Sequence, residues 1–316
     1  MTELLELGVD PAACLSRAAE VLRRGGLCAF PTETVYGLGA DALNPEAVAA
    51  IFGAKGRPVS NPLIVHVADV EGAQRLVKMW PAAAGALAER FWPGPLTLVL
   101  PRKEIVPDVT TAGLDSVAVR VPDHPFAREL IRAAGGALAA PSANRSTAVS
   151  PTTAKHVLDG LGGRIDLIID GGPTRVGIES TVVSLLDQEV RLLRPGDVSR
   201  AELEALVGRV AIGGQGPARS PGMMSRHYAP QSAVSLVPAE ALDEHAGADA
   251  VALVYGASPD GYALVHRLPS NPAGYAKGLY AALRDLDARV DRIVIERVPD
   301  DEAWVAVADR LERAAR

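Results

Sequence analysis

The chain of 316 residues has little cysteine and no long apolar run, and these shortages exclude several classes of protein. Its two cysteines, Cys14 and Cys28, belong to no CxxC pair or His/Cys cluster, so a disulfide framework and a zinc site are both poorly supported. No apolar stretch approaches the ~20 residues that a membrane-spanning helix needs. The N-terminus carries acidic residues and no continuous apolar core, which argues against a secretory signal. The sequence therefore predicts a cytoplasmic protein with no membrane partner.

Positive charge is also in short supply. There are 32 Lys and Arg against 38 Asp and Glu, which gives a net charge of −6. A protein that binds nucleic acid over its whole surface is usually basic, so we expect any RNA contact to be weak and local. Hydrophobic residues make up 48% and charged residues 22%, as in ordinary globular proteins, and the length suits two domains.

Several catalytic signatures are missing. The sequence contains no GxxxxGK[ST] phosphate loop, no GxGxxG after a predicted strand and no GxSxG nucleophile elbow. No group of Asp and Glu has clear metal-binding spacing. An enzyme with this sequence is therefore expected to bind and position charged substrates rather than supply a covalent nucleophile.

Helix and strand patterns alternate through the first two-thirds of the chain. Asp10-Pro11 and Asn44-Pro45 are typical helix starts, and the second helix is expected to run towards Lys55. The turn-forming residues of 31–41 predict a turn-rich segment. Strands are expected at 27–30, 63–67, 96–100, 117–121, 137–140, 167–169, 181–185 and 190–193. Some of these are separated by helices and others by turns only, which predicts one mixed, twisted α/β sheet flanked by helices over residues 1–211.

The composition changes at residues 212–230, where glycine and proline punctuate the chain without any period. We interpret this segment as a linker, and its Arg219, Arg226, His227 and Tyr228 suggest the hypothesis of a lid over the site. Residues 231–316 again alternate strands with helices. They predict a smaller C-terminal domain with a Rossmann-like parallel sheet.

The tripeptide Lys55-Gly56-Arg57 follows a predicted helix and precedes a proline. Both cations can turn towards one anion, since the glycine lets the backbone come close and the arginine can fork onto a phosphate. The alternative is that both only complement the helix dipole.

Other polar residues stand at the ends of predicted strands. Asn61 precedes an apolar strand that contains His66, and each is a candidate ligand contact or, alternatively, a turn cap and an interior histidine. Residues 140–144 suit anion or hydroxyl recognition, or form an ordinary turn. Residues 177–181 and Arg194 either face a crevice or belong to the plain surface.

Taken together, these segments resemble the YrdC/Sua5 family of threonylcarbamoyl-AMP synthases. The resemblance rests on PTETVYGLG (31–39), KGRP (55–58), NPLIVH (61–66), FWPGPLT (91–97), VAVRVP (117–122), AAPSAN (139–144), IESTVV (178–183) and LRPG (193–196). Their joint order and spacing are specific, although no single motif is. The stretch SPGMMSRHYAP and the extra domain after it resemble the longer, two-domain Sua5 type.

The resemblance implies a nucleotidyltransferase reaction. L-threonine, bicarbonate or CO2, and ATP would give L-threonylcarbamoyl-adenylate and pyrophosphate. The product would pass to the tRNA threonylcarbamoyl-transferase complex for N6-threonylcarbamoyladenosine at position 37 of tRNA. Mg2+ would enter with the ATP phosphates, without protein side chains as metal ligands.

The resemblance also implies the roles of individual residues. Lys55 and Arg57 would be catalytic and steer the phosphates. The threonine contacts would be Thr34, His66, Arg120, Ala140 and Ser180. The ATP contacts would be Arg57, Asn61, Ser116, Ser142, Ser150, Arg194 and Tyr228. Tyr228 is equally well interpreted as a buried anchoring tyrosine.

Two other functions compete with this one. A concave sheet with clustered Lys and Arg could serve as an RNA-binding module without catalysis, against which the net charge argues. A different carbamoyl transfer, as in the related domain of hydrogenase maturation proteins, is disfavoured because their zinc-finger CxxC pairs are missing here.

Overall fold

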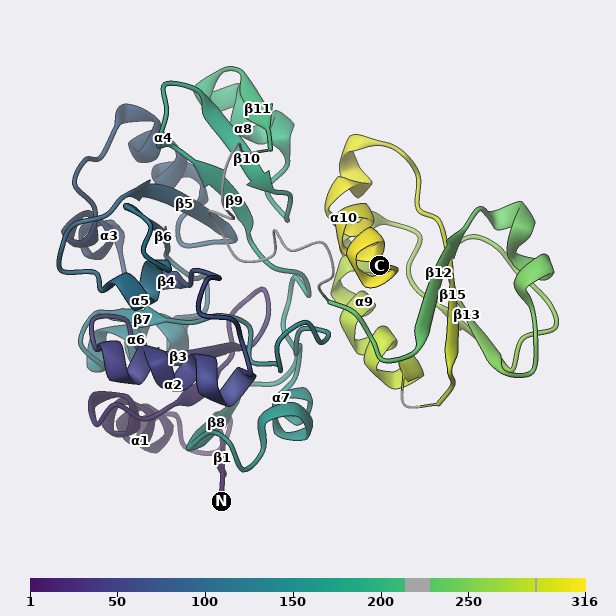
Figure 1. Cartoon of the computed structure of the whole chain (residues 1–316), viewed down its shortest axis with the longest axis horizontal. Helices are drawn as coiled ribbons and strands as arrows, with labels where there is room; N and C mark the ends of the chain where they lie inside the picture. Colours follow the sequence, from purple (N-terminus) through teal and green to yellow (C-terminus); the bar gives the residue numbers. More distant parts are fainter. Residues whose placement is uncertain (214–227, 288) are drawn as a thin grey trace.

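The computed structural model describes residues 1–213, 228–287 and 289–316, and these form two sheets with their helices (Figure 1). The larger sheet has the strand order β1-β8-β2-β3-β7-β4-β6-β5-β9-β10-β11 and contains both parallel and antiparallel pairs. Its strands are β1 (Glu3–Glu6), β2 (Cys28–Phe30), β3 (Gly37–Asp41), β4 (Ile64–Val67), β5 (Leu96–Pro101), β6 (Ser116–Arg120), β7 (Ala137–Ala139), β8 (Leu167–Asp170), β9 (Thr181–Ser184), β10 (Val190–Arg194) and β11 (Val210–Ile212). The expected mixed sheet is confirmed.

The helices of this part begin and end where local chemistry favours it. The Asn44 side chain accepts hydrogen bonds from the backbone N–H groups of Glu46 and Ala47, at 3.0 and 3.1 Å, and so caps α2. Gly56 ends the same helix in the left-handed conformation, with φ of 61°. The helices are α1 (Pro11–Arg23), α2 (Pro45–Lys55), α3 (Val70–Leu76), α4 (Ala82–Phe91), α5 (Asp108–Thr111), α6 (Pro125–Ala133), α7 (Ala154–Leu161) and α8 (Arg200–Val207).

The segment 31–41 corrects the prediction of a turn-rich stretch, because its second half forms strand β3. This strand pairs with β2 and β7 inside the sheet. Gly39 allows a close approach, since a Cβ there would lie 2.7 Å from the Phe30 ring. Glycine therefore serves strand packing here, and only the residues before β3 remain a turn.

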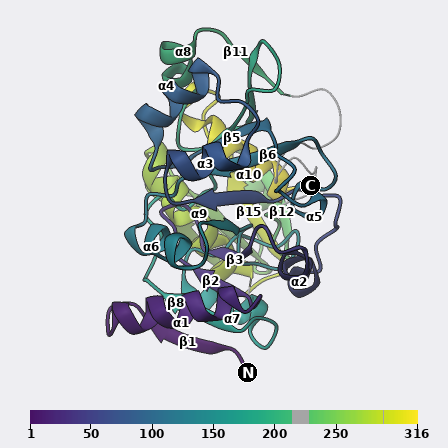
Figure 2. The same ribbon diagram turned by 90° about the vertical axis from the view of Figure 1, so that its left-hand side faces the viewer.

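Alternate residues of the strands supply two layers of core. From β2, Cys28 and Phe30 pack with α1 and α6 on one face, while Ala29 faces the cluster that contains residues of α2 and α7. Figure 2, viewed from the side of the larger sheet, shows this layered body in front of the C-terminal part.

The smaller sheet is wholly parallel, as predicted, with the order β12-β15-β13-β14. Its elements are β12 (Ala233–Val237), 3₁₀ helix η1 (Ala239–His245), β13 (Ala250–Val254), β14 (Leu264–Arg267), α9 (Pro272–Asp287), β15 (Arg292–Glu296), 3₁₀ helix η2 (Glu302–Trp304) and α10 (Val305–Ala314). No helix in the described ranges is both long and apolar enough to cross a membrane.

Helices α9 and α10 lie between the two sheets (Figure 1). One apolar cluster spans this boundary: it joins Val35, Val176 and Ile178 of the larger part to Tyr275 of α9 and Leu311 of α10. The predicted linker over 212–230 falls mostly on residues 214–227, so its Arg219, Arg226 and His227, and the lid hypothesis with them, lie outside the described residues.

Candidate active site

A cavity in the larger part of the chain is bordered by loop residues before β3 and by the ends of several strands. Its lining is Thr32, Thr34, Val35, Gly37, Arg57, Ile64, His66, Arg120, Ala140, Pro141, Ser142, Glu179, Ser180, Arg194 and Tyr228. The structure therefore brings together all five predicted threonine contacts. Of the predicted nucleotide residues, Arg57, Ser142, Arg194 and Tyr228 also line the cavity, whereas Lys55, Asn61, Ser116 and Ser150 do not.

The imidazole of His66, on β4, is buried and uncharged at neutral pH. Burial and the nearby positive charge of Arg120 lower its pKa from 6.5 to about 3. In the described ranges, no hydrogen-bond partner reaches its Nδ1 atom. A neutral ring with an unsatisfied nitrogen can hydrogen-bond a hydroxyl group but offers no positive charge to a carboxylate.

Arg120 ends β6 and is oriented by three groups around it. Its Nη2 donates to Glu33 Oε1 at 2.6 Å, Nη1 donates to Thr34 Oγ1 at 3.0 Å and Nε donates to the Gly94 carbonyl at 3.2 Å. A guanidinium carries five N–H groups, so these bonds fix its plane while leaving donors for an anion. Glu33 is a buried carboxylate to which the sequence reading gave no role.

Ser180, just before β9, is hydrogen-bonded to Arg194, the last residue of β10. Arg194 Nη2 donates to the Ser180 carbonyl at 2.8 Å and to Ser180 Oγ at 3.1 Å. The same Oγ lies 2.8 Å from Thr97 Oγ1 on β5. The hydroxyl of Ser180 is thus held in one place by a cation and a second hydroxyl.

Lys55 ends α2 with its ammonium buried. Its Nζ donates to the carbonyls of Ser142 and Asn144, both at 2.5 Å. Burial, with a smaller effect from Arg57, lowers its pKa well below the usual value. Lys55 therefore ties the loop after β7 to the end of α2.

Arg57 follows Gly56 and lines the cavity. Its Nε donates to the Asn61 carbonyl at 3.3 Å and its Nη2 to the Pro62 carbonyl at 3.1 Å. Burial lowers its pKa to about 10, which still leaves it charged at neutral pH. Asn61 thus contributes its backbone to the position of Arg57.

Three predicted nucleotide contacts make interactions with other parts of the protein. Ser116 begins β6 opposite Pro101 of β5. Ser150 donates its hydroxyl to Glu179 Oε1 at 2.5 Å. Tyr228 is buried and stacks on Tyr280, with ring centroids 5.7 Å apart, and also lines the cavity. The sequence left open whether Tyr228 contacts the nucleotide or is a buried anchoring residue. In the structure it is buried and also lines the cavity.

Several buried groups around the site escaped the sequence reading. Glu33, Thr97 and Glu179 stand within or beside the recognised motifs, so their position next to predicted contacts was the available signal. Tyr280 and Arg310 carry no such signal, because they lie far along the chain in ordinary amphipathic helices. In residues 1–213, 228–287 and 289–316, no cluster of three or more His, Cys, Asp or Glu could hold a metal ion.

Comparison with known proteins identifies the relatives of this chain. Residues 20–196 match the Sua5/YciO/YrdC family model, described as "Telomere recombination", and residues 198–316 match the model described as "Threonylcarbamoyl-AMP synthase, C-terminal domain". The chain belongs to the Sua5/YciO/YrdC family. The second of these two models matches from residue 198, before α8. It therefore also covers helix α8 and strand β11 of the larger part.

Full-length relatives in this family share both parts of the chain. The threonylcarbamoyl-AMP synthase of Pyrococcus abyssi is 44% identical, with 94% of this chain and 93% of that protein covered. The threonylcarbamoyl-AMP synthase of Bacillus subtilis is 42% identical, with 95% and 92% covered. The crystal structure of P. abyssi Sua5 in complex with L-threonine superposes with a TM-score of 0.93 at 42% identity, covering 100% of this chain and 97% of that one. The predicted membership of the YrdC/Sua5 family and the predicted two-part α/β fold are both confirmed.

Proposed function

We propose that this protein synthesises L-threonylcarbamoyl-adenylate from L-threonine, bicarbonate or CO2, and ATP, with release of pyrophosphate. The observation that carries the proposal is one cavity in which Thr34, His66 and Arg120 face the same space as Arg57 and Arg194. Relatives named threonylcarbamoyl-AMP synthase match almost the full chain, and threonine is bound in the P. abyssi structure. In this proposal residues 1–211 are catalytic, 212–230 join the domains and 231–316 form the second domain.

The chemistry suits a site without a nucleophile of its own. The threonine amine forms a carbamate, with loss of a proton when it adds to CO2 or loss of water when it reacts with bicarbonate. A carbamate oxygen then attacks the α-phosphate, and pyrophosphate leaves. Arg57 and Arg194 are placed to offset the charge of the phosphates, which ATP brings as its Mg2+ complex. Arg120 would hold the threonine carboxylate, and the neutral His66 would contact its hydroxyl.

The roles of the remaining residues follow from their contacts. Lys55 would act by holding the Ser142 and Asn144 carbonyls, and so the loop that carries Ser142 to the nucleotide. The product would pass to the tRNA threonylcarbamoyl-transferase complex, with any direct tRNA contact local. An RNA-binding module without catalysis is not favoured, because the relatives are named as synthases.

The test is mass spectrometry of the products. The protein is incubated with ATP, Mg2+, bicarbonate and threonine, and each is omitted in turn. We expect a threonylcarbamoyl-adenylate and pyrophosphate only in the complete mixture. Pyrophosphate release that does not need threonine, or no adenylate at all, would contradict the proposal.

A further inference from the structure

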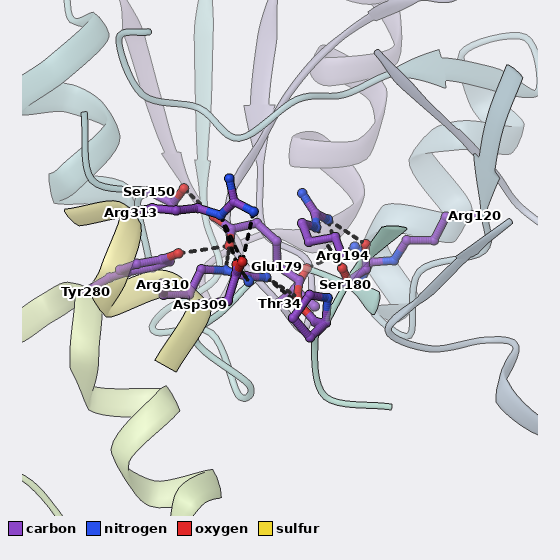
Figure 3. Close-up of polar contacts among 11 residues, drawn as sticks. Thr34, Arg120, Ser150, Glu179, Ser180, Arg194, Tyr280, Asp309, Arg310 and Arg313 are labelled. Carbon is purple, nitrogen blue, oxygen red and sulfur yellow. Dashed lines mark hydrogen bonds and ion pairs between the residues drawn. The ribbon is translucent and has the colours of Figure 1, made fainter. Parts of the chain in front are cut away.

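Glu179 is a buried carboxylate at the boundary between the two parts of the chain, just before β9. Its Oε1 accepts a hydrogen bond from Ser150 Oγ at 2.5 Å. Its Oε2 accepts from the Tyr280 hydroxyl of α9 at 2.8 Å and from Arg310 Nε of α10 at 2.9 Å. Figure 3 shows these side chains converging on the carboxylate from both domains. One acidic group thus joins a loop of the larger part to both C-terminal helices.

Arg310 is fully buried, with 0% of its side chain exposed. Its Nη2 donates to the Pro195 carbonyl at 3.0 Å and to the Glu179 carbonyl at 3.4 Å, and its Nη1 pairs with Asp309 at 2.6 Å. Its guanidinium carbon also lies 5.3 Å from the centroid of the Tyr228 ring. A single side chain of the last helix therefore contacts three separate segments that border the cavity.

These contacts fall directly beside predicted substrate residues. Glu179 precedes Ser180, and Pro195 follows Arg194, so the two carbonyls that Arg310 binds lie next to the Ser180–Arg194 pair. Ser150, a predicted ATP contact outside the cavity lining, is itself held by the Glu179 carboxylate. Arg310, from the other domain, therefore holds the segments that carry Ser150, Ser180 and Arg194.

The charge state of Glu179 depends on the same arginine. Burial alone would raise the pKa of this carboxyl, but Arg310 and Arg194 hold it at about 2. A buried ion pair contributes little net stability compared with apolar residues of the same volume, whereas removal of one partner leaves a charge without compensation. Fixing the orientation of neighbouring groups is a function that such a pair serves better than apolar packing does.

We infer that Arg310, from the C-terminal domain, is a positioning residue for the active site: it holds Glu179 and Pro195, and through them sets Ser150, Ser180 and Arg194 for the substrates. The inference rests on the proposed function. It assigns the second domain an indirect part in substrate binding by the first, because Arg310 acts through residues that it holds and does not itself line the cavity.

The experiment measures steady-state adenylate formation by the full chain carrying Arg310→Met, Arg310→Lys or Tyr280→Phe. We expect Arg310→Met to raise the KM for ATP about tenfold and to raise the KM for threonine, with little change in kcat, because the chemistry itself is untouched. Arg310→Lys keeps the positive charge and is expected to recover part of the affinity for ATP. Tyr280→Phe removes one hydrogen bond to the same carboxylate and is expected to raise the KM for ATP about threefold.

Arg289→Met is the matched control, because Arg289 is an exposed arginine of the same domain that pairs with Asp285 at 3.0 Å. It is expected to leave both KM values unchanged. A lower Tm in Arg310→Met with unchanged KM values would show that Arg310 only stabilises the interface, and would overturn the inference. If Arg310→Met does not fold, Tyr280→Phe decides in the same way. A wild type that forms no adenylate would instead remove the proposed function and this inference with it.

Discussion

His66 lies directly opposite Arg120 on the neighbouring parallel strands β4 and β6. This register places a buried imidazole beside a buried guanidinium. Burial, with a further contribution from the positive charge of Arg120, lowers the pKa of the ring and keeps it neutral. Both residues line one cavity, so the sheet itself, rather than a loop, sets the separation of the proposed hydroxyl contact and the proposed carboxylate contact.

The pKa of His66 predicts how protein stability depends on pH. In the folded state this pKa is about 3, below the ordinary 6.5, so the unfolded chain binds the proton more readily. The contribution to stability is complete above pH 6.5 and is lost as the pH falls from 6.5 towards 3. In His66→Gln we expect urea unfolding over this range to show a pH slope smaller by about one proton. An unchanged slope would mean that the ring is already charged in the folded protein.

Arg57 is expected to contribute directly to the reaction. Removing a cation that stabilises developing charge on phosphate by about 3 kcal/mol lowers the rate by ~100-fold or more, so Arg57→Ala should reduce adenylate formation by that factor. Arg23→Ala, at the exposed end of α1, is the control and should retain full activity. Normal pyrophosphate release by Arg57→Ala would contradict its assignment.

Thr97 holds the Ser180 hydroxyl from a neighbouring strand. Thr97→Val preserves the shape but removes the hydrogen bond between the two hydroxyls, so we expect the KM for threonine to rise several-fold with little change in kcat. Thr110→Val is matched: Thr110 is equally buried, and its hydroxyl donates to the Ala42 carbonyl at 2.9 Å. Both variants should lose about 1 kcal/mol of stability, and only Thr97→Val should change the KM. Equal KM values in the two variants would rule out this role.

Gly177 of the larger part lies against the backbone of α9. Its φ is +88°, and a Cβ there would lie 2.5 Å from the Lys277 Cα of α9. Gly163→Ala has similar backbone strain, at φ of +78°, but its Cβ would meet nothing within 4 Å. We therefore expect Gly177→Ala to be the more destabilising by about 1–3 kcal/mol in thermal unfolding, and to raise the KM for ATP by displacing α9. Equal stability of the two variants would show that α9 can move to accommodate the added methyl group without any loss of stability.

The sequence predicted most strands of the larger sheet and the parallel C-terminal sheet, because apolar runs and turn residues mark them clearly. It missed the edge strands β1 and β11 and the inner strand β3. Gly37 and Gly39 of β3 are typical of turns, and only packing against Phe30 shows why a strand needs glycine there. For Lys55 it predicted a cation turned towards a ligand anion. The structure instead directs Nζ to two backbone carbonyls, and spacing along the chain carries no information on which acceptor is nearer.

The role of Arg310 also could not be predicted from the sequence. Its helix has the ordinary amphipathic pattern, and an arginine in such a helix is normally expected at the surface. Only the tertiary structure reveals that an acidic partner from a segment 131 residues away lies on the buried side. The sequence motifs identified residues around the cavity, but they did not indicate that Arg310 of the second domain contacts the segments beside them.

The apolar cluster that joins Val35, Val176 and Ile178 to Tyr275 and Leu311 also has a consequence for folding. During synthesis the larger sheet leaves the ribosome first, with these side chains uncovered and the Glu179 carboxylate lacking its cationic partner from α10. Helices α9 and α10, which are synthesised later, then cover this surface. The two sheets are therefore expected to melt in one cooperative transition rather than two, since neither retains a complete interior once the other has unfolded.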